Sequence, residues 1–267
     1  MQAVRTEPFY FGRGERLFGV LDAPASGADA PGVVLCQPFG HEYVWCHRAC
    51  RQLALRLAGA GCAVLRFDYD GCGDSLGESH EADLERWVGD AAQALEELRA
   101  RCARVHAIGL RLGAAVATLL CERRGGVERL LLWEPVLHGA AYLAELARLH
   151  ASHEEKQGWR AGEAQAAAGL AQGREVLGFA LSPALVRDLE RLDLRAPERP
   201  PAPEICVLQS RVAPADGGAW AARLAGSARV EELVLEEAGP WIVEPYKMAM
   251  PVKGLAAIVE RMAGSTA

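Results

Sequence analysis

The chain has 267 residues, 51% of them hydrophobic and 24% charged, and its formal net charge is −6. This length allows roughly three quarters of the unfolded surface to be buried in one domain with an elaboration. The negative charge argues against a nucleic-acid partner, and the lack of an apolar run of about 18 residues argues against a membrane span.

The first quarter of the chain predicts a hairpin followed by buried strands. Two short strand-like runs at residues 9–11 and 16–21, separated by glycines, predict an opening β-hairpin. Apolar runs at residues 32–36 and 62–67 are bounded by Gly and Pro, which is typical of buried parallel strands. The Ala-, Leu- and Arg-rich segment between them predicts a helix of about 15 residues.

A helix, a strand and a second helix are predicted next. Apolar residues repeat at helical spacing over residues 84–98, and a strand is expected at residues 105–109. Apolar positions one helical turn apart predict another helix over residues 112–120. Arg111 is therefore expected at the junction of a strand and a helix.

The rest of the chain continues this alternation after one interruption. Further apolar runs predict strands at residues 129–133, 205–209 and 229–235, with helices after the last two. Residues 138–203 are Ala-rich and end among prolines, so we expect a helical lid insertion there. The expected fold class is α/β, a doubly wound and mostly parallel sheet with an N-terminal hairpin, whose core comprises residues 1–137 and 204–267.

A glycine-flanked arginine stands at the predicted strand-to-helix junction. The segment Gly109-Leu110-Arg111-Leu112-Gly113 has the spacing of a G-x-S-x-G nucleophile elbow, with arginine in the place of serine. A guanidinium with a pKa above about 12 is neither a nucleophile nor a base near neutral pH. The sequence therefore predicts an elbow without the chemistry of its serine.

The base of a Ser-acid-His triad is missing as well. Such a histidine would follow the last strand, yet none of the seven histidines lies beyond His153. The corresponding loop, residues 237–241, ends in Trp241, which can pack but cannot accept a proton. Asp216 lies roughly where the triad acid would be, and is interpreted either as a helix cap or as an ion-pair partner of Arg111.

Several segments carry a family resemblance: Gln37-Pro38-Phe39-Gly40-His41-Glu42, Asp70-Gly71-Cys72-Gly73-Asp74-Ser75, Gly109-Leu110-Arg111-Leu112-Gly113-Ala114, Leu132-Trp133-Glu134-Pro135-Val136 and Tyr142-Leu143. On these segments the chain resembles the α/β-hydrolases, and specifically the second of the exosortase A system-associated hydrolases. The resemblance implies a bacterial setting near exopolysaccharide production and protein sorting. It also implies that the chain would be named a hydrolase, but a fold alone does not establish an activity.

Two other groups of residues have a weaker catalytic interpretation. A second match to G-x-S-x-G contains Ser75, but Ser75 lies several residues beyond its strand, so Asp74 and Ser75 are expected to hold the loop through side-chain to backbone bonds. Cys46 and Cys50 lie near His41, yet no second ligand pair with zinc spacing accompanies them. We expect these cysteines on a core face of a helix, and we expect neither a metal nor a cofactor.

The first residues lack the apolar core of a signal peptide, so the sequence predicts a cytoplasmic protein. The eight cysteines are accordingly expected as thiols rather than disulfides. The oligomeric state is not indicated by the sequence.

The altered elbow predicts a site for an anion. The N-terminus of a helix attracts negative charge, and a guanidinium adds a full positive charge suited to carboxylate or phosphate. The expected ligand-binding set, which includes the former oxyanion hole, consists of Arg111, Leu112, Phe39, Gly40, His41 and Trp241. In the alternative interpretation, Arg111 neutralises a buried carboxylate such as Asp216 or Glu42 and supports the fold.

Three functions follow from this site. In the first, the protein lacks triad hydrolysis and binds an anionic or acyl small molecule or a partner. In the second, it is an ester or thioester hydrolase or acyltransferase that uses Cys46, His41 or Glu42. In the third, it is an interaction module that uses the surface of the lid.

Overall fold

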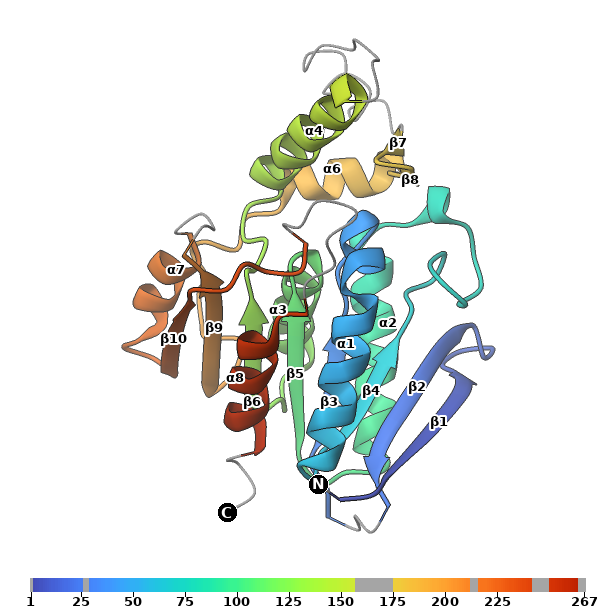
Figure 1. Ribbon diagram of the computed structural model, residues 1–267, viewed down its shortest axis with the longest axis vertical. Coiled ribbons are helices and arrows are strands. Elements are labelled where there is room, and N and C mark those ends of the chain that lie inside the picture. Colours follow the sequence, from blue (N-terminus) through green and yellow to red (C-terminus); the bar gives the residue numbers. More distant parts are fainter. Residues whose placement is uncertain (1, 26–28, 157–174, 212–215, 242–249, 264–267) are drawn as a thin grey trace.

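An eight-stranded sheet forms the centre of the protein in the computed structural model, which describes residues 2–25, 29–156, 175–211, 216–241 and 250–263 (Figure 1). The strand order is β1-β2-β4-β3-β5-β6-β9-β10. The strands are β1 (Val4–Phe11), β2 (Leu17–Pro24), β3 (Gly32–Cys36), β4 (Ala63–Phe67), β5 (Val105–Leu110), β6 (Arg129–Trp133), β9 (Glu204–Ser210) and β10 (Arg229–Leu235). β2 pairs antiparallel with both β1 and β4, and the other neighbouring pairs are parallel.

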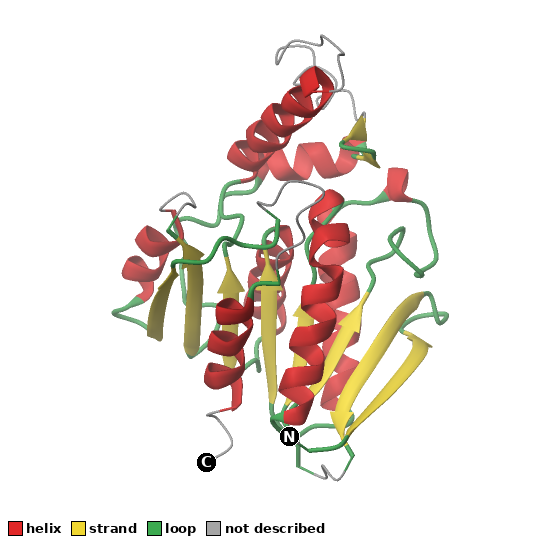
Figure 2. Ribbon diagram, in the orientation of Figure 1, coloured by secondary structure: helices red, strands yellow, loops and turns green. Residues whose placement is uncertain are grey.

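Helices cover both faces of this sheet (Figure 2). They are α1 (His41–Gly59), η1 (Ser79–Glu81), α2 (Leu84–Arg99), α3 (Leu112–Arg124), α4 (Gly139–Lys156), α6 (Pro183–Arg191), α7 (Asp216–Leu224) and α8 (Val252–Ala263). Val33 and Leu35 of β3 pack in one apolar cluster with α1 and α8, whereas Val34 between them packs in the other cluster with α2 and α3. This alternation explains why β3 is apolar throughout, since both of its faces are buried.

The segment between β6 and β9 lies at the carboxyl ends of the parallel strands (Figure 1). Its described part contains α4, α6 and a small hairpin of β7 (Glu175–Val176) and β8 (Phe179–Ala180). α4 begins against α6, because a Cβ on Gly139 would lie 2.1 Å from the carbonyl oxygen of Leu189. The segment is therefore placed over the edge of the sheet where the elbow lies.

The expected doubly wound, mostly parallel sheet is confirmed, with local differences. β1 starts at Val4 rather than at residue 9, because it is an edge strand whose exposed positions and Pro8 hide the strand pattern. α1 has 19 residues instead of about 15. The inserted segment, expected to be helical, also contains the β7–β8 hairpin.

All eight cysteines are free thiols, and seven of them are buried. Burial raises the pKa of Cys50 and of Cys206 to about 12, so these thiols pack as small apolar side chains. Across the described residues, no helix has the length and apolar character needed to cross a membrane.

Candidate functional site

Arg111 occupies the turn between β5 and α3. β5 ends at Leu110 and α3 begins at Leu112, so Arg111 is the one residue between strand and helix. Its φ of 52° and ψ of −121° lie in a region that residues with a Cβ rarely adopt. Its N–H donates to the carbonyl oxygen of Trp133 at 3.1 Å, and its own carbonyl accepts from the N–H of Val136 at 3.2 Å. This is the strained strand-to-helix geometry of a nucleophile elbow.

Two glycines allow the close contacts behind this turn. A Cβ on Gly109 would lie 2.4 Å from the Cα of Ala114. A Cβ on Gly113 would lie 2.3 Å from the carbonyl oxygens of Cys36 and Gln37. The first turn of α3 therefore lies directly against the end of β3, which requires glycine at both positions.

The residues that follow β3 are brought next to the first turn of α3. Gly40 is the N-cap of α1 with φ of 62°, and a Cβ there would lie 3.5 Å from Phe179 of the inserted segment. The N–H of Leu112 opens α3, where no preceding helical turn supplies an acceptor. The Phe39 ring is buried against Trp87 with ring centroids 5.0 Å apart, so Phe39 can offer a ligand its backbone alone.

Two carboxylates hold the guanidinium of Arg111. Its Nε donates to Glu42 Oε1 at 2.7 Å, and its Nη2 donates to Glu145 Oε1 at 2.6 Å. The Tyr142 hydroxyl donates to Glu42 Oε2 at 2.9 Å, and the Tyr142 ring centroid lies 5.6 Å from Arg111 Cζ. Glu42 belongs to the first turn of α1, whereas Tyr142 and Glu145 belong to α4. The cluster therefore joins the elbow and α1 to the inserted segment.

The charged groups of this cluster differ in exposure. The side chains of Arg111 and Glu42 are 7% and 2% exposed, whereas that of Glu145 is 37% exposed. Burial raises the pKa of Glu42, although Arg111 and a hydrogen bond from Tyr142 oppose this effect. Burial disfavours the charge on Arg111, but Glu42 and Glu145 outweigh it and raise the pKa of the guanidinium. Arg111 therefore stays cationic. Its contacts match the alternative interpretation, in which it neutralises the buried carboxylate of Glu42.

Glu134 and Trp241 form a second pair beside Arg111. Glu134 directly follows β6 with φ of 44°, and Trp241 lies in the loop after β10. Trp241 Nε1 donates to Glu134 Oε2 at 2.7 Å, and Glu134 Oε1 accepts from the N–H of Ser210 at 3.2 Å. The centroid of the Trp241 ring lies 5.9 Å from Arg111 Cζ.

Arg111, Glu134 and Trp241 follow each other in the chain order of the nucleophile, acid and base of an α/β-hydrolase triad. The Glu134–Trp241 bond has the form of the bond by which an acid orients an imidazole. An indole N–H can only donate, however, and a guanidinium is no nucleophile. The Glu134–Trp241 pair therefore lies beside Arg111 in a triad-like chain order, but Arg111 cannot act as a nucleophile and Trp241 cannot act as a base.

The candidate catalytic residues His41 and Cys46 lie in different surroundings. Nε2 of His41 is buried without a hydrogen-bond partner in the described part of the chain. Burial, reinforced by the charge of Arg111, lowers the pKa of His41 to about 4, so its imidazole is neutral at pH 7. Cys46 is buried in the core together with Cys50, and burial raises its pKa well above the usual value. The elbow therefore has a neutral imidazole and the bound carboxylate of Glu42 nearby, but Cys46 supplies no thiolate.

The second G-x-S-x-G match belongs to a structural loop. Ser75 Oγ accepts from the N–H of Phe18 at 2.8 Å and donates to the carbonyl oxygen of Asp68 at 2.6 Å, which confirms the expected side-chain to backbone bonds. For Asp74 the contact differs from the expectation, because its backbone N–H donates to the Asp68 carboxylate at 3.0 Å. Ser75 thus holds the loop after β4 against β2.

The site residues expected from the sequence did not include Glu134 or Glu145. Glu134 directly follows a predicted buried strand, and the carboxyl ends of parallel strands are where sites gather, so its position is a usable signal. Glu145 follows Tyr142 by one helical turn, but its approach to Arg111 depends on how the inserted segment folds over the sheet. The side chain of Asp216 lies outside the described residues, so both interpretations of it, as a helix cap or as an ion-pair partner of Arg111, stay predictions.

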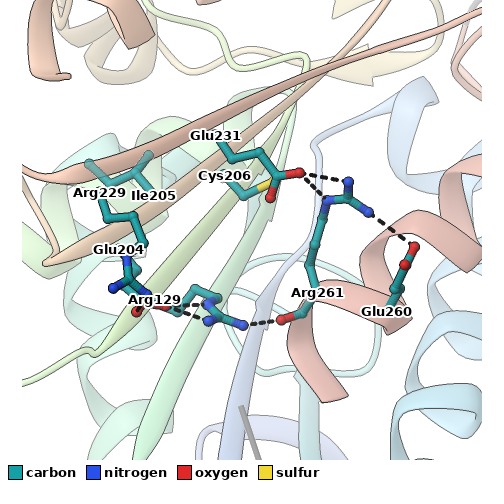
Figure 3. Close-up of a pocket in the computed structure, with 8 residues that line it drawn as sticks. All are labelled: Arg129, Glu204, Ile205, Cys206, Arg229, Glu231, Glu260 and Arg261. Carbon is teal, nitrogen blue, oxygen red and sulfur yellow. Dashed lines mark hydrogen bonds and ion pairs between the residues drawn. The ribbon is translucent and has the colours of Figure 1, made fainter. Parts of the chain in front are cut away.

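A cavity of about 240 Å³ lies at the amino ends of β6, β9 and β10 (Figure 3). The elbow follows the carboxyl end of β5, at the opposite edge of the sheet. Its lining residues are Arg129, Glu204, Ile205, Cys206, Arg229, Glu231, Glu260 and Arg261. The three arginines are paired with the three glutamates, for example Arg229 with Glu204 at 2.9 Å and Arg261 with Glu231 at 2.6 Å (Figure 3). The cavity therefore offers a ligand no net charge, and its ion pairs connect the strands to α8. In the part of the chain that the structure describes, no cluster of His, Cys, Asp and Glu is arranged to hold a metal ion.

Comparison with known sequences identifies a family. The sequence model of the family described as "Serine aminopeptidase, S33" matches residues 33–190, more than half of the chain. An uncharacterized protein of Mycobacterium tuberculosis, found in two strains, is 37% identical over 115 residues, which cover 42% of this chain and 38% of that protein. The chain thus spans about two fifths of the length of the curated relatives it matches.

Solved structures share the fold over almost the whole chain. Est1E from Butyrivibrio proteoclasticus, determined with ferulic acid, aligns with a TM-score of 0.66 and 16% identity over 93% of both chains. An esterase from Pyrobaculum calidifontis aligns with a TM-score of 0.65 and 17% identity over 98% of this chain and 85% of that one. Alpha/beta hydrolase domain-containing protein 10 from mouse aligns with a TM-score of 0.58 and 17% identity over 96% of this chain and 99% of that one. At these identities the likeness concerns the fold alone.

Proposed function

Because the chain belongs to the serine aminopeptidase S33 family of the α/β-hydrolase superfamily, we propose that it is a member in which binding of a small molecule replaces triad hydrolysis. The ligand is an anionic or acyl molecule, and it binds at Arg111 beneath the inserted segment. In this proposal residues 138–203 act as a lid over the site, and the rest of the chain is the core.

One observation carries the proposal. The hydrogen bond from Trp241 to Glu134, 2.7 Å long, takes the part of the bond between base and acid in a triad, and Arg111 takes the part of the nucleophile. Both reactive members of the triad are replaced at once. A single substitute group elsewhere would have to supply attack and proton transfer together, and the buried Cys46 thiol is unsuited to either.

Binding is supported by what the elbow keeps. The N–H of Leu112 at the start of α3 and the backbone at Gly40 are available as donors, as in an oxyanion hole. The rings of Tyr142 and Trp241 lie on the guanidinium of Arg111, with centroids 5.6 Å and 5.9 Å from its Cζ. Such a mixture of polar donors and apolar rings suits an acyl chain that ends in a polar group.

The wider setting follows from sequence resemblance. The Gly-Leu-Arg-Leu-Gly string at the elbow, shared with the second of the exosortase A system-associated hydrolases, supports a role beside bacterial exopolysaccharide production. In that setting the protein would act in the cytoplasm on an acyl ligand or on a protein of the same machinery.

Turnover assays test the loss of hydrolysis. The purified protein is incubated with p-nitrophenyl esters and acyl thioesters, and separately with a serine-reactive fluorophosphonate. We expect no labelling and no turnover above that of the Arg111→Ala variant. Native mass spectrometry of the freshly purified protein is expected to show a carried-over small molecule.

Turnover that disappears in a Cys46→Ala or His41→Ala variant would contradict the proposal and favour a hydrolase that uses substitute residues. Lack of turnover together with lack of any bound molecule would contradict the binding part, and would favour an interaction module that uses the lid surface.

A further inference from the structure

We propose that Glu145 occupies the binding point of a small monocarboxylate with an apolar tail, and that this ligand binds Arg111 by displacing Glu145. The inference rests on the proposed binding function of the same site and names its ligand class. In the unliganded protein, the Glu145 carboxylate thus occupies the place at Arg111 that the ligand carboxylate takes on binding.

The two carboxylates on Arg111 are not equivalent. Glu42 is 2% exposed and bonded at both oxygens, to Arg111 and to Tyr142, so it belongs to the permanent structure of the site. Glu145 is 37% exposed and reaches Arg111 through one bond, from Nη2 to Oε1 at 2.6 Å. An exposed side chain loses less on leaving an ion pair, because water solvates it afterwards. Glu145 is therefore the partner that a ligand can replace.

Charge selects what can replace it. Glu42 alone compensates Arg111, and the buried guanidinium still needs an acceptor at Nη2 when Glu145 leaves. A monocarboxylate supplies that acceptor and restores the charge of the original cluster. A neutral amide offers a weaker acceptor, because hydrogen bonds to ionised groups are roughly twice as strong.

A second group close to Arg111 lacks a partner. His41 is 6% exposed, and its Nε2 has no hydrogen-bond partner among the described residues. His41 directly precedes Glu42 in the first turn of α1, and the charge of Arg111 is one cause of its lowered pKa. A buried polar atom without a partner is costly, and a bound carboxylate would satisfy it by accepting the Nε2–H bond.

The surroundings favour an apolar tail. The guanidinium lies over the rings of Tyr142 and Trp241, and Phe179 of the inserted hairpin lies against Gly40 at the start of α1. A carboxylate head at Nη2 would therefore be followed by apolar surface, which favours hexanoate over acetate by burial of methylene groups.

Calorimetric titration of four protein forms tests the proposal. Hexanoate, acetate and hexanamide are titrated into the wild type, Glu145→Gln, the control Glu155→Gln on an exposed position of the same helix, and a Glu42→Gln/Arg111→Gln/Glu145→Gln triple variant. The triple variant removes both charges of the buried pair together, so that neither is left uncompensated. We expect hexanoate to bind Glu145→Gln at least about tenfold more tightly than the wild type, because the internal competitor is gone.

We expect Glu155→Gln to bind hexanoate like the wild type, the triple variant to lose it, and acetate and hexanamide to bind Glu145→Gln more weakly than hexanoate does. Equal affinity of Glu145→Gln and the wild type, no binding to Glu145→Gln, or equal binding of hexanamide would overturn the proposal; equal binding of acetate would overturn its apolar tail. Ester turnover by the wild type would contradict the loss of hydrolysis without changing these titrations, so the two failures can be told apart.

Discussion

At the scale of single residues, Arg111 belongs to a buried ion pair. It occupies the position at which a nucleophile elbow normally presents a hydroxyl. Because the side chains of Arg111 and Glu42 are 7% and 2% exposed, each depends on the other for compensation of its charge. A buried pair need not add stability over an apolar pair, but breaking it leaves a costly charge. The stability of the fold is therefore expected to depend on the pair as a unit.

Removing one member of this pair should be worse than removing both. Arg111→Met is expected to lower the free energy of unfolding by about 3 kcal/mol, because Glu42 stays buried without its cation. Adding Glu42→Gln should recover part of this loss, which urea unfolding of the single and double variants would measure. Arg211→Met removes an exposed pair with Glu236 and should cost less than about 1 kcal/mol. Equal costs for Arg111→Met and the double variant would contradict a coupled pair.

The proposed correspondence of Arg111, Glu134 and Trp241 to a triad predicts that activity can be rebuilt. Arg111→Ser places a hydroxyl at the elbow but leaves Trp241, which cannot accept a proton, in the position of the base, so this variant should stay inert. Combining it with Trp241→His gives Glu134 an imidazole to orient, and should raise p-nitrophenyl ester turnover at least about a hundredfold over Arg111→Ser.

Labelling by a fluorophosphonate serves as the second readout of the rebuilt site. The double variant should be labelled, whereas each single variant should not. A folded double variant that shows neither turnover nor labelling would mean that Glu134 and Trp241 do not hold the acid and base positions.

At the scale of elements, the contact between the start of α3 and the end of β3 positions the whole site. Gly113→Ala is expected to cost more than about 3 kcal/mol of unfolding free energy, because its Cβ would lie 2.3 Å from two backbone oxygens that cannot move independently. Gly89→Ala provides the matched control, since Gly89 is an exposed position within α2 with open space around it. That change should stabilise the protein by about 0.5–1 kcal/mol. Thermal unfolding of both variants checks the opposite signs.

The elements also show what a sequence can predict. The bounds of β3 and β6 were predictable because short apolar runs between Gly and Pro signals are buried on both faces of the sheet. β1 was largely hidden, because an edge strand has exposed positions and tolerates Pro8.

The site could be predicted in part for the same kind of reason. Arg111 and Trp241 are fixed by their spacing from strands, so their places at the elbow and after β10 follow from the sequence. The partners Glu42 and Glu145 lie 69 and 34 residues from Arg111, and their approach depends on how α1 and α4 pack. Glu42 entered the sequence analysis as one alternative, whereas Glu145 could not be found, because no local pattern records the packing of an inserted segment.

At the scale of the whole molecule, two buried histidines make stability depend on pH. Burial is the main cause that lowers the pKa of His41 and of His106 to about 4 each, so both are neutral in the folded state at pH 7. In the unfolded chain a histidine has a pKa of about 6.5 and binds a proton on acidification. Between pH 6.5 and 4 the unfolded state therefore binds more protons than the folded state, and stability falls as the pH falls.

His106 allows this effect to be isolated, since it lies within β5 away from Arg111 and is 1% exposed. Arg129 and Arg104 also lower its pKa, and Glu204 opposes them.

In His106→Leu the loss of unfolding free energy between pH 7 and pH 5 should be smaller than in the wild type by about 2 kcal/mol, because one proton is no longer taken up on unfolding. Urea unfolding at both pH values measures this difference, and His153→Leu, at an exposed position of α4, should keep the wild-type dependence. Buried acids such as Asp90, whose pKa burial raises to about 6, act in the opposite direction, but they do so equally in all three proteins and cancel in the comparison. An unchanged pH dependence in His106→Leu would show that His106 is protonated in the folded protein, and with it that the core of the sheet admits a charge at β5.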